Sequence, residues 1–181
     1  MSTNEWFTPP EYVQSVRMVL GRIDLDPASC DKANRNVRAD RIYTEEDNGL
    51  MHPWYGRVFC NPPYGKTQQG KASNLEAFTR KLIEEYWLRH VTEAILLIPA
   101  NTATSWFDLL WEFSICFPKS RIRFLQADGR PGDGVSFGTC FVYFGSNEAD
   151  FSRVFSKYGH VVPASGAQKP IAQEIWAGGV A

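Results

Sequence analysis

The sequence predicts a doubly wound α/β domain, in which helices cover both faces of a largely parallel sheet. Two continuous apolar runs, residues 94–98 and 139–144, have the length and composition of buried strands. Two amphipathic stretches, residues 11–20 and 74–89, repeat their apolar residues at helical spacing. Helices alternate with strands through the middle of the chain, which indicates a βαβ core. The length of 181 residues suits a single domain, expected to span 1–181.

In the first half of the chain, a helix precedes several short elements. The apolar residues of 11–20 lie on one helical face, and Gly21 follows as a stop signal. We then expect, in order, a buried strand at 23–26, an edge strand at 41–43, an acidic turn at 45–49 and an apolar strand at 57–60. The short separation of Asp26 and Asp47 leaves little room for a full helix and a second strand.

The second half supplies the rest of the predicted α/β pattern, and beyond Phe144 no further element is expected. The elements are a loop at 65–73, a helix at 74–89, a strand at 94–98, a helix at 105–113, strands at 114–117 and 122–124, a loop at 126–134 and a last strand at 139–144. No large insertion follows Tyr64, so we expect no separate target-recognition domain.

Composition restricts the possible function classes. The formal net charge of −1, from 19 Lys and Arg against 20 Asp and Glu, is unlike that of a strongly basic nucleic-acid binder. A local basic patch remains compatible with this balance, because phosphate contacts need only a few cations. The four cysteines lack metal-ligand spacing, so we expect reduced thiols and no metal. No apolar run approaches membrane-spanning length, so we expect no membrane partner and a cytoplasmic protein.

The tetrapeptide Asn61-Pro62-Pro63-Tyr64 follows a predicted strand and resembles the signature of amino-methyltransferases. An exocyclic amine is a poor nucleophile because its lone pair is delocalised into the ring. Two acceptors aimed at its hydrogens, the Asn61 side-chain carbonyl and the Pro62 main-chain carbonyl, would restore that lone pair. Pro62 and Pro63 stiffen the loop, and Tyr64 offers a face on which an extruded base would stack. Taken alone, however, Asn-Pro-Pro is also an ordinary turn sequence.

Asp26 and Asn61 both lie at predicted strand ends. In doubly wound sheets, ligands bind outside the carboxyl ends of the strands, near the point where the strand order reverses. We therefore expect the two side chains to share one crevice, although they are far apart in the sequence. The alternative for Asp26 is a cap on the helix that would follow it.

Three further segments, together with Asn-Pro-Pro-Tyr-Gly, resemble in their order the phage-type DNA N-6-adenine methyltransferase family. They are residues 5–10, residues 24–29, and residues 43–50 with Trp54 following. The resemblance spans roughly residues 5 to 145 and implies a compact Rossmann-like sheet and S-adenosylmethionine as the cofactor. Members are typically carried by bacteriophages and prophages, with protection from restriction as a family-level purpose.

The resemblance also implies where the cofactor binds. Trp6, Thr8 and Pro9 would touch its methionine end, with the helix amides that follow receiving the carboxylate. Asp26 would attract the ammonium, directly or through water. The remaining cofactor-binding candidates are Pro27, Ala28, Asp47 and Asn61.

Several of these positions keep alternatives open. Asp47 would contact the adenosine, with Glu45 and Glu46 as close competitors, or it would simply form the turn. Lys66 and Lys71 would contact DNA phosphates, or they are solvated loop charges. The first-strand motif has Pro-Ala-Ser in place of the G-x-G glycines of larger methyltransferases.

The leading functional hypothesis is methyl transfer from S-adenosylmethionine to the exocyclic amine of a flipped adenine in DNA. Two alternatives remain. The same tetrapeptide also serves methylation of RNA and of protein glutamine, and the near-neutral charge is compatible with both. A non-catalytic cofactor-fold protein that binds DNA or a partner is the alternative from another class. The sequence gives no recognition site and no oligomeric state.

Overall fold

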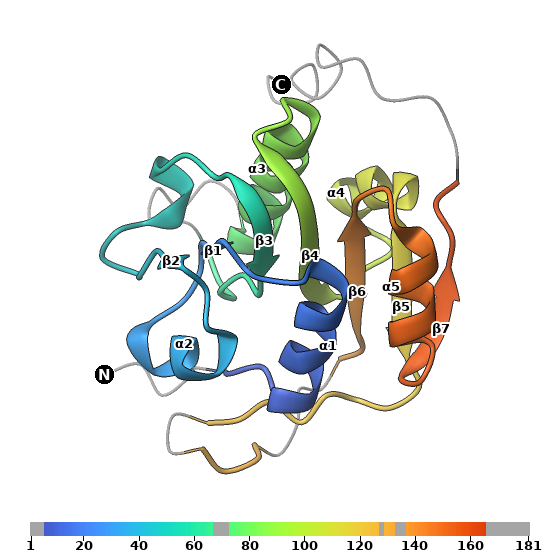
Figure 1. The fold of residues 1–181 in the computed structure, drawn as a ribbon, viewed down its shortest axis with the longest axis horizontal. Helices are drawn as coiled ribbons and strands as arrows, with labels where there is room; N and C mark the ends of the chain where they lie inside the picture. Colours follow the sequence, from blue (N-terminus) through green and yellow to red (C-terminus); the bar gives the residue numbers. More distant parts are fainter. Residues whose placement is uncertain (1–5, 67–72, 127–128, 133–136, 166–181) are drawn as a thin grey trace.

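The computed structural model describes residues 6–66, 73–126, 129–132 and 137–165. Within these ranges, seven strands form one mixed sheet (Figure 1). Across the sheet the order is β2 (Arg41–Ile42), β1 (Leu25–Asp26), β3 (Gly56–Cys60), β4 (Val91–Pro99), β6 (Thr139–Phe144), β5 (Ser114–Pro118) and β7 (Gly159–Val162). The first four are parallel, and β6 runs antiparallel between β4 and β5. The doubly wound α/β prediction is therefore confirmed, with an antiparallel portion at one side.

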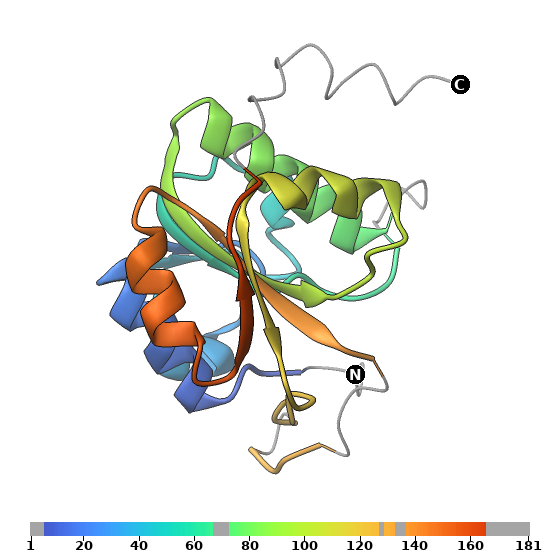
Figure 2. The same ribbon diagram turned by 90° about the vertical axis from the view of Figure 1, so that its right-hand side faces the viewer.

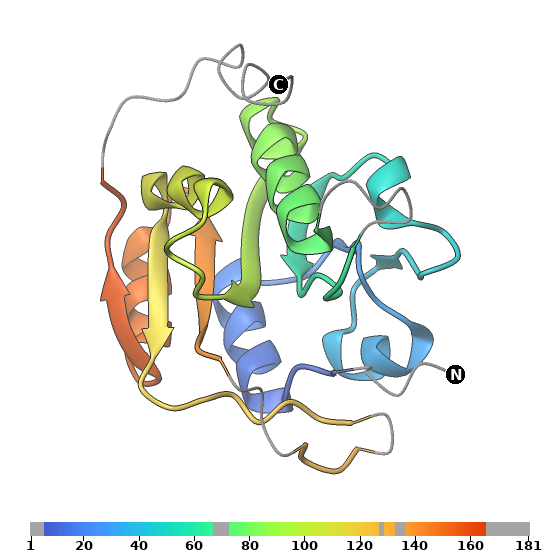
Figure 3. The same ribbon diagram turned by 180° about the vertical axis from the view of Figure 1, so that it is seen from behind.

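Helices cover both faces of this sheet (Figures 1 and 2). One face carries α1 (Pro10–Leu20), α2 (Asp31–Val37) and α5 (Glu148–Phe155). The other carries α3 (Asn74–Trp87), α4 (Ser105–Asp108) and the 3₁₀ turns η1 (Gly49–Met51) and η2 (Leu109–Glu112), as the rear view in Figure 3 also shows. A hydrophobic cluster fills each layer, so the central strands are buried on both faces. No helix in the described ranges is both long and apolar enough to span a bilayer.

The predicted helices begin and end at the residues that favour such boundaries. Pro10 occupies the first turn of α1, where its missing N–H costs nothing, and Gly21 closes the helix at φ +76°. The Ser73 hydroxyl caps α3 by accepting from the Glu76 amide at 3.2 Å. These local signals explain why both helices were predictable.

Several predictions were wrong. The edge strand expected at 41–43 is present as β2, but a two-turn helix, α2, also fits between Asp26 and Asp47, where little room was expected. Residues 122–124 are not a strand of the sheet, and residues 105–113 divide into α4 and η2. Both α5 and β7 lie beyond Phe144, where no element was expected.

The strand order reverses between β1 and β3, which lie side by side in parallel. From β1 the chain crosses to β2 on one side, and from β3 it crosses to β4 on the other. The carboxyl ends of β1 and β3 therefore flank the switch point at which such sheets bind ligands. Asp26 is the last residue of β1 and Asn61 directly follows β3, so both lie at the ends of adjacent parallel strands as expected, and a shared crevice stays a prediction.

Candidate active site

Asn61 is oriented by the segment that precedes α1. Its side-chain nitrogen Nδ2 lies 3.5 Å from the main-chain carbonyl of Trp6 and 3.4 Å from the hydroxyl Oγ1 of Thr8. A carbonyl oxygen only accepts, so the amide NH₂ must face Trp6 and the oxygen Oδ1 must face away from it. Within the described residues no group donates to Oδ1. Asn61 therefore keeps a hydrogen-bond acceptor available at the end of the sheet where the parallel strands β1 and β3 finish.

The remainder of the tetrapeptide is partly enclosed. Pro62 is buried, Pro63 is exposed and Tyr64 is half-buried. The edge of one ring meets the face of the other between Tyr64 and Phe137, with ring centroids 5.5 Å apart and planes at 73°. Burial raises the pKa of Tyr64 to about 12, so its hydroxyl is neutral at physiological pH. Phe137 was not predicted, because no spacing in the sequence links it to Tyr64.

Asp26 is a buried carboxyl group with no cationic partner among the described residues. Only 4% of the residue is exposed, and one carboxylate oxygen accepts from the Ala28 amide at 3.2 Å. Burial raises the pKa of Asp26 to about 7, while the Ala28 amide and the Ser29 hydroxyl act in the opposite direction. No described Lys, Arg or His pairs with it. It does not cap α2 either, because the Cys30 sulfur accepts from the Ala33 amide there.

The acidic turn packs directly against the end of β1. A Cβ atom added to Gly49 would lie 2.0 Å from the carbonyl oxygen of Pro27, so only glycine fits this contact. The Ser29 amide donates to the Tyr43 carbonyl at 2.9 Å and strengthens the same junction. These contacts bring together residues 27–29 and 43–49, which belong to two separate segments of the sequence that resemble family motifs.

Asp47 itself is exposed and engaged within its own turn. Its Oδ2 accepts from the Thr44 amide at 2.9 Å and from the Thr44 hydroxyl at 3.0 Å. The same hydrogen bonds hold the pKa of Asp47 below its usual range. This geometry accounts for the turn-forming role, and a contact to adenosine stays a prediction.

The segment before α1 lies between several of these groups. Thr8 and Pro9 are buried, and the ring of Trp6 packs against Gly132, where a Cβ atom would lie 2.2 Å from it. Among the residues that the structure describes, no side chain caps the amino end of α1. However, Pro10 has no amide hydrogen and Glu11 adds negative charge there, so this helix end is a poor receptor for a carboxylate.

Lys66 is exposed, and its main chain pairs with Ser73 at the base of the loop that follows the tetrapeptide. Lys71 lies outside the described residues. In the part of the chain that the structure describes, no group of three or more His, Cys, Asp or Glu residues is placed to hold a metal ion. All four cysteines are free, and three of them are buried: Cys60, Cys116 and Cys140.

The mixed seven-stranded sheet with helices on both faces is the architecture of a Rossmann-like methyltransferase. The model of the family DNA N-6-adenine-methyltransferase (Dam) matches residues 2–147, and the chain belongs to this family. The match ends near the start of α5, so α5 and β7 lie outside it. No curated protein matches the chain.

Proposed function

We propose that this chain is one methyltransferase domain that transfers a methyl group from S-adenosylmethionine to the N6 amine of an adenine extruded from DNA. The observation that carries the proposal is the orientation of Asn61, whose Oδ1 is left as an acceptor beside the main chain of Pro62. Membership of the DNA adenine methyltransferase family supports DNA as the substrate. Action in a bacterial host cytoplasm, from a phage or prophage gene, belongs to the same proposal.

The residues at the switch point fit S-adenosylmethionine. That cofactor supplies an electrophilic methyl group on a sulfonium and carries an ammonium on its methionine end. Asp26 is a buried carboxylate that lacks a cation among the described residues, and an ammonium would stabilise its ionised form. Asp26 is at one end of the proposed cofactor site, and Trp6, Thr8 and Pro9 border it from the segment before α1. Pro27, Ala28 and Asp47 complete the set on the side of β1 and β2.

The chemical roles of the tetrapeptide follow from its donors and acceptors. Asn61 Oδ1 and the Pro62 carbonyl would accept the two amine hydrogens, which draws the nitrogen toward tetrahedral geometry and frees its lone pair. Tyr64 would stack on the extruded base, and Pro63 restricts the loop between them. A proton then leaves the nitrogen late in the reaction, to water or to Asn61.

The first test is a product assay. Purified protein is incubated with unmethylated DNA and labelled S-adenosylmethionine, the DNA is digested to nucleosides, and N6-methyldeoxyadenosine is quantified. Labelled product supports the proposal. Label found only in RNA or in protein supplied in parallel would indicate that this molecule is the substrate. No label and no cofactor binding would indicate a non-catalytic scaffold.

Asn61→Ala tests the mechanism in the same assay. Removal of one preorganised oxyanion-hole donor typically costs about 10²–10³ in kcat, and we expect a loss of that order for this preorganised acceptor. Cofactor affinity, measured by titration calorimetry on the same preparation, should change little and serves as the folding control. Near-normal turnover in this variant would exclude the proposed role of Asn61.

A further inference from the structure

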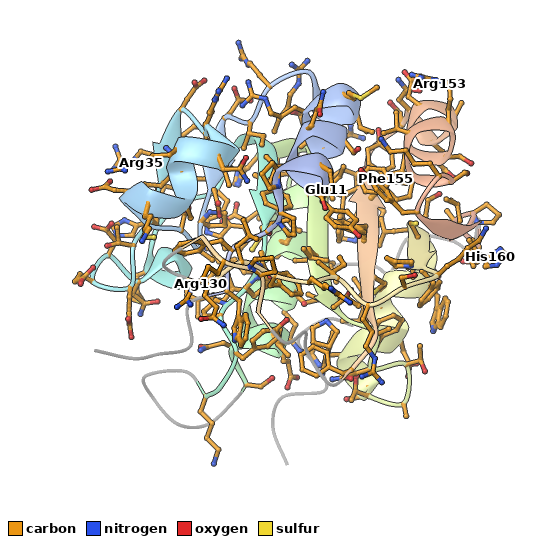
Figure 4. All side chains as sticks on the ribbon, turned by 90° about the horizontal axis from the view of Figure 1, so that it is seen from below. Glu11, Arg35, Arg130, Arg153, Phe155 and His160 are labelled. Atoms are coloured by element: carbon orange, nitrogen blue, oxygen red, sulfur yellow. The ribbon has the colours of Figure 1, made fainter. Side chains whose placement is uncertain are left out.

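The segment 119–125 crosses the carboxyl edge of the sheet as an extended strap outside the sheet (Figures 1 and 4). Its main chain is fixed at Leu125, which exchanges two hydrogen bonds of 2.8 Å with Phe7. Ile122 and Phe124 are fully buried in the cluster beneath α1. The strap is therefore anchored both by its backbone and by alternate side chains.

The side chains between these anchors are cationic and face solvent. Lys119, Arg121 and Arg123 are all exposed, and residues 119–123 contain no acidic residue. In extended backbone, successive side chains point to opposite faces. Arg121 and Arg123 therefore point to the same face, about 6.7 Å apart along the strap. We call these three residues the cationic ledge.

The ledge has no counter-ion among the described residues, a property that it shares with several other exposed cations, such as Lys32 and Arg35 on α2. None of its three residues forms an ion pair in the part of the chain that the structure describes. Elsewhere, many cations lie within 4.0 Å of a carboxylate: Arg22, Arg57, Arg80, Lys81 and Arg153. Three cations within five residues thus make this short segment locally positive, although the whole chain has a net charge of −1.

The strap is adjacent to the candidate active site. Phe7, its main-chain partner, stands between Trp6 and Thr8, the two residues that orient Asn61. Figure 4 looks onto this edge of the molecule and shows the strap running across it toward Arg130. Acidic Glu11, at the start of α1, lies on the same side and limits the positive potential near the middle of the strap.

We propose that the cationic ledge binds backbone phosphates of the DNA substrate beside the target adenine, and this rests on the proposed function. Phosphate contacts set the position of a protein on DNA without reading its sequence. A ledge fixed to Phe7 would thereby hold the duplex in register with Asn61. It would supply the positive surface that the overall charge balance does not reveal.

The experiment compares DNA binding by three forms of the full chain. They are the wild type, the double variant Arg121→Gln/Arg123→Gln, and the control Arg22→Gln/Arg89→Gln. The control removes two charges next to the amino ends of β1 and β4, at the opposite edge of the sheet. Binding of a short labelled duplex is followed by fluorescence anisotropy from 50 to 200 mM salt.

Each neutralised phosphate contributes about 0.9 to the slope of log affinity against log salt. The slope for the ledge variant should therefore be smaller by about 1.8. Between 50 and 200 mM salt, the wild type should then lose about twelve times more affinity than the variant. The control should keep the wild-type slope. Arg121→Lys/Arg123→Lys should restore most of the slope, since lysine also neutralises phosphate.

The possible results separate the two proposals. An unchanged slope in the ledge variant, with wild type still methylating adenine in DNA, overturns the ledge and leaves the function standing. An equal loss in the control also overturns it, because the effect would then be one of total charge. A wild type that neither binds nor methylates DNA overturns both. Cofactor affinity equal to wild type shows that the variant is folded.

Discussion

The side-chain nitrogen of Asn36 donates to the main-chain carbonyl of Thr8, with 3.0 Å between the two atoms. Thr8 in turn accepts, through its hydroxyl, from the side chain of Asn61 at 3.4 Å. Helix α2 is thus connected through one residue to the amide proposed to act on the substrate. Asn36 contacts neither reacting group and is therefore a positioning residue.

We expect Asn36→Ala to lower kcat by about two- to tenfold, the kinetic equivalent of one neutral hydrogen bond of 0.5–1.5 kcal/mol. Asn36→Asp keeps the shape but removes the donor, so it should be at least as impaired. The matched control is Lys32→Ala, an exposed position on the same helix. A change confined to thermal stability, with kcat intact in both Asn36 variants, would show that the contact is only structural.

The raised pKa of Asp26 predicts an unusual pH dependence of stability. The folded protein holds the Asp26 proton up to about pH 7, whereas the unfolded chain releases it near pH 3.8, the ordinary pKa of an aspartate. Stability from this group is therefore fully present below about pH 4 and is lost as pH rises to about 7. A shift of about three pKa units corresponds to at most about 4 kcal/mol.

Asp26→Asn stays neutral at every pH and keeps an acceptor for the Ala28 amide. Its free energy of unfolding, relative to wild type, should rise between pH 5 and pH 8 in denaturant titrations without cofactor. The affinity of the wild type for S-adenosylmethionine should rise with pH as Asp26 ionises. The affinity of Asp26→Asn should show no such rise. If the free energy of unfolding of the two proteins changed with pH in parallel, the pKa of Asp26 would be the same in the folded and unfolded states.

The sequence predicted those parts of the fold that carry a repeating apolar pattern. Helices α1 and α3 and strands β3, β4 and β6 have such patterns, and each was expected near its observed bounds. Helix α2 lacks an apolar stripe, since Val37 is its one buried residue, and its cap is the uncommon Cys30 thiol. No local pattern distinguishes such a helix from a polar loop.

The candidate site shows the same limit. Asn61 and Asp26 were predictable because each ends a strand, and a parallel sheet brings strand ends together. The Phe137 contact and the path of the strap were not, because Tyr64, the partner of Phe137, and Phe7, the partner of Leu125, lie far away in the sequence. Residues 122–124 alternate like a strand but do not join the sheet: the Phe124 carbonyl accepts from the Gly132 amide, and Leu125, the next residue, pairs with Phe7.

Gly49 tests how the acidic turn is held against β1. Gly49→Ala places a methyl group 2.0 Å from the Pro27 carbonyl, a clash with main chain that only a backbone shift relieves. Overpacking of this kind costs about 1–3 kcal/mol, and we expect that loss in the free energy of unfolding. Gly138→Ala is the control, because no atom lies within 4 Å of its added methyl group. Equal stability of the two variants would mean that the turn moves freely.

Tyr64 separates stacking from hydrogen bonding at the proposed base site. Tyr64→Phe retains the ring and its contact with Phe137, whereas Tyr64→Ala removes the aromatic face. Base stacking on an aromatic side chain is worth about 1–3 kcal/mol, so Tyr64→Ala should raise the KM for DNA by about 5- to 150-fold. Tyr64→Phe should remain within a few-fold of wild type, because a neutral hydroxyl is not required for stacking. Equal impairment of both variants would instead assign the role to the hydroxyl, and unchanged kinetics in Tyr64→Ala would place the base elsewhere.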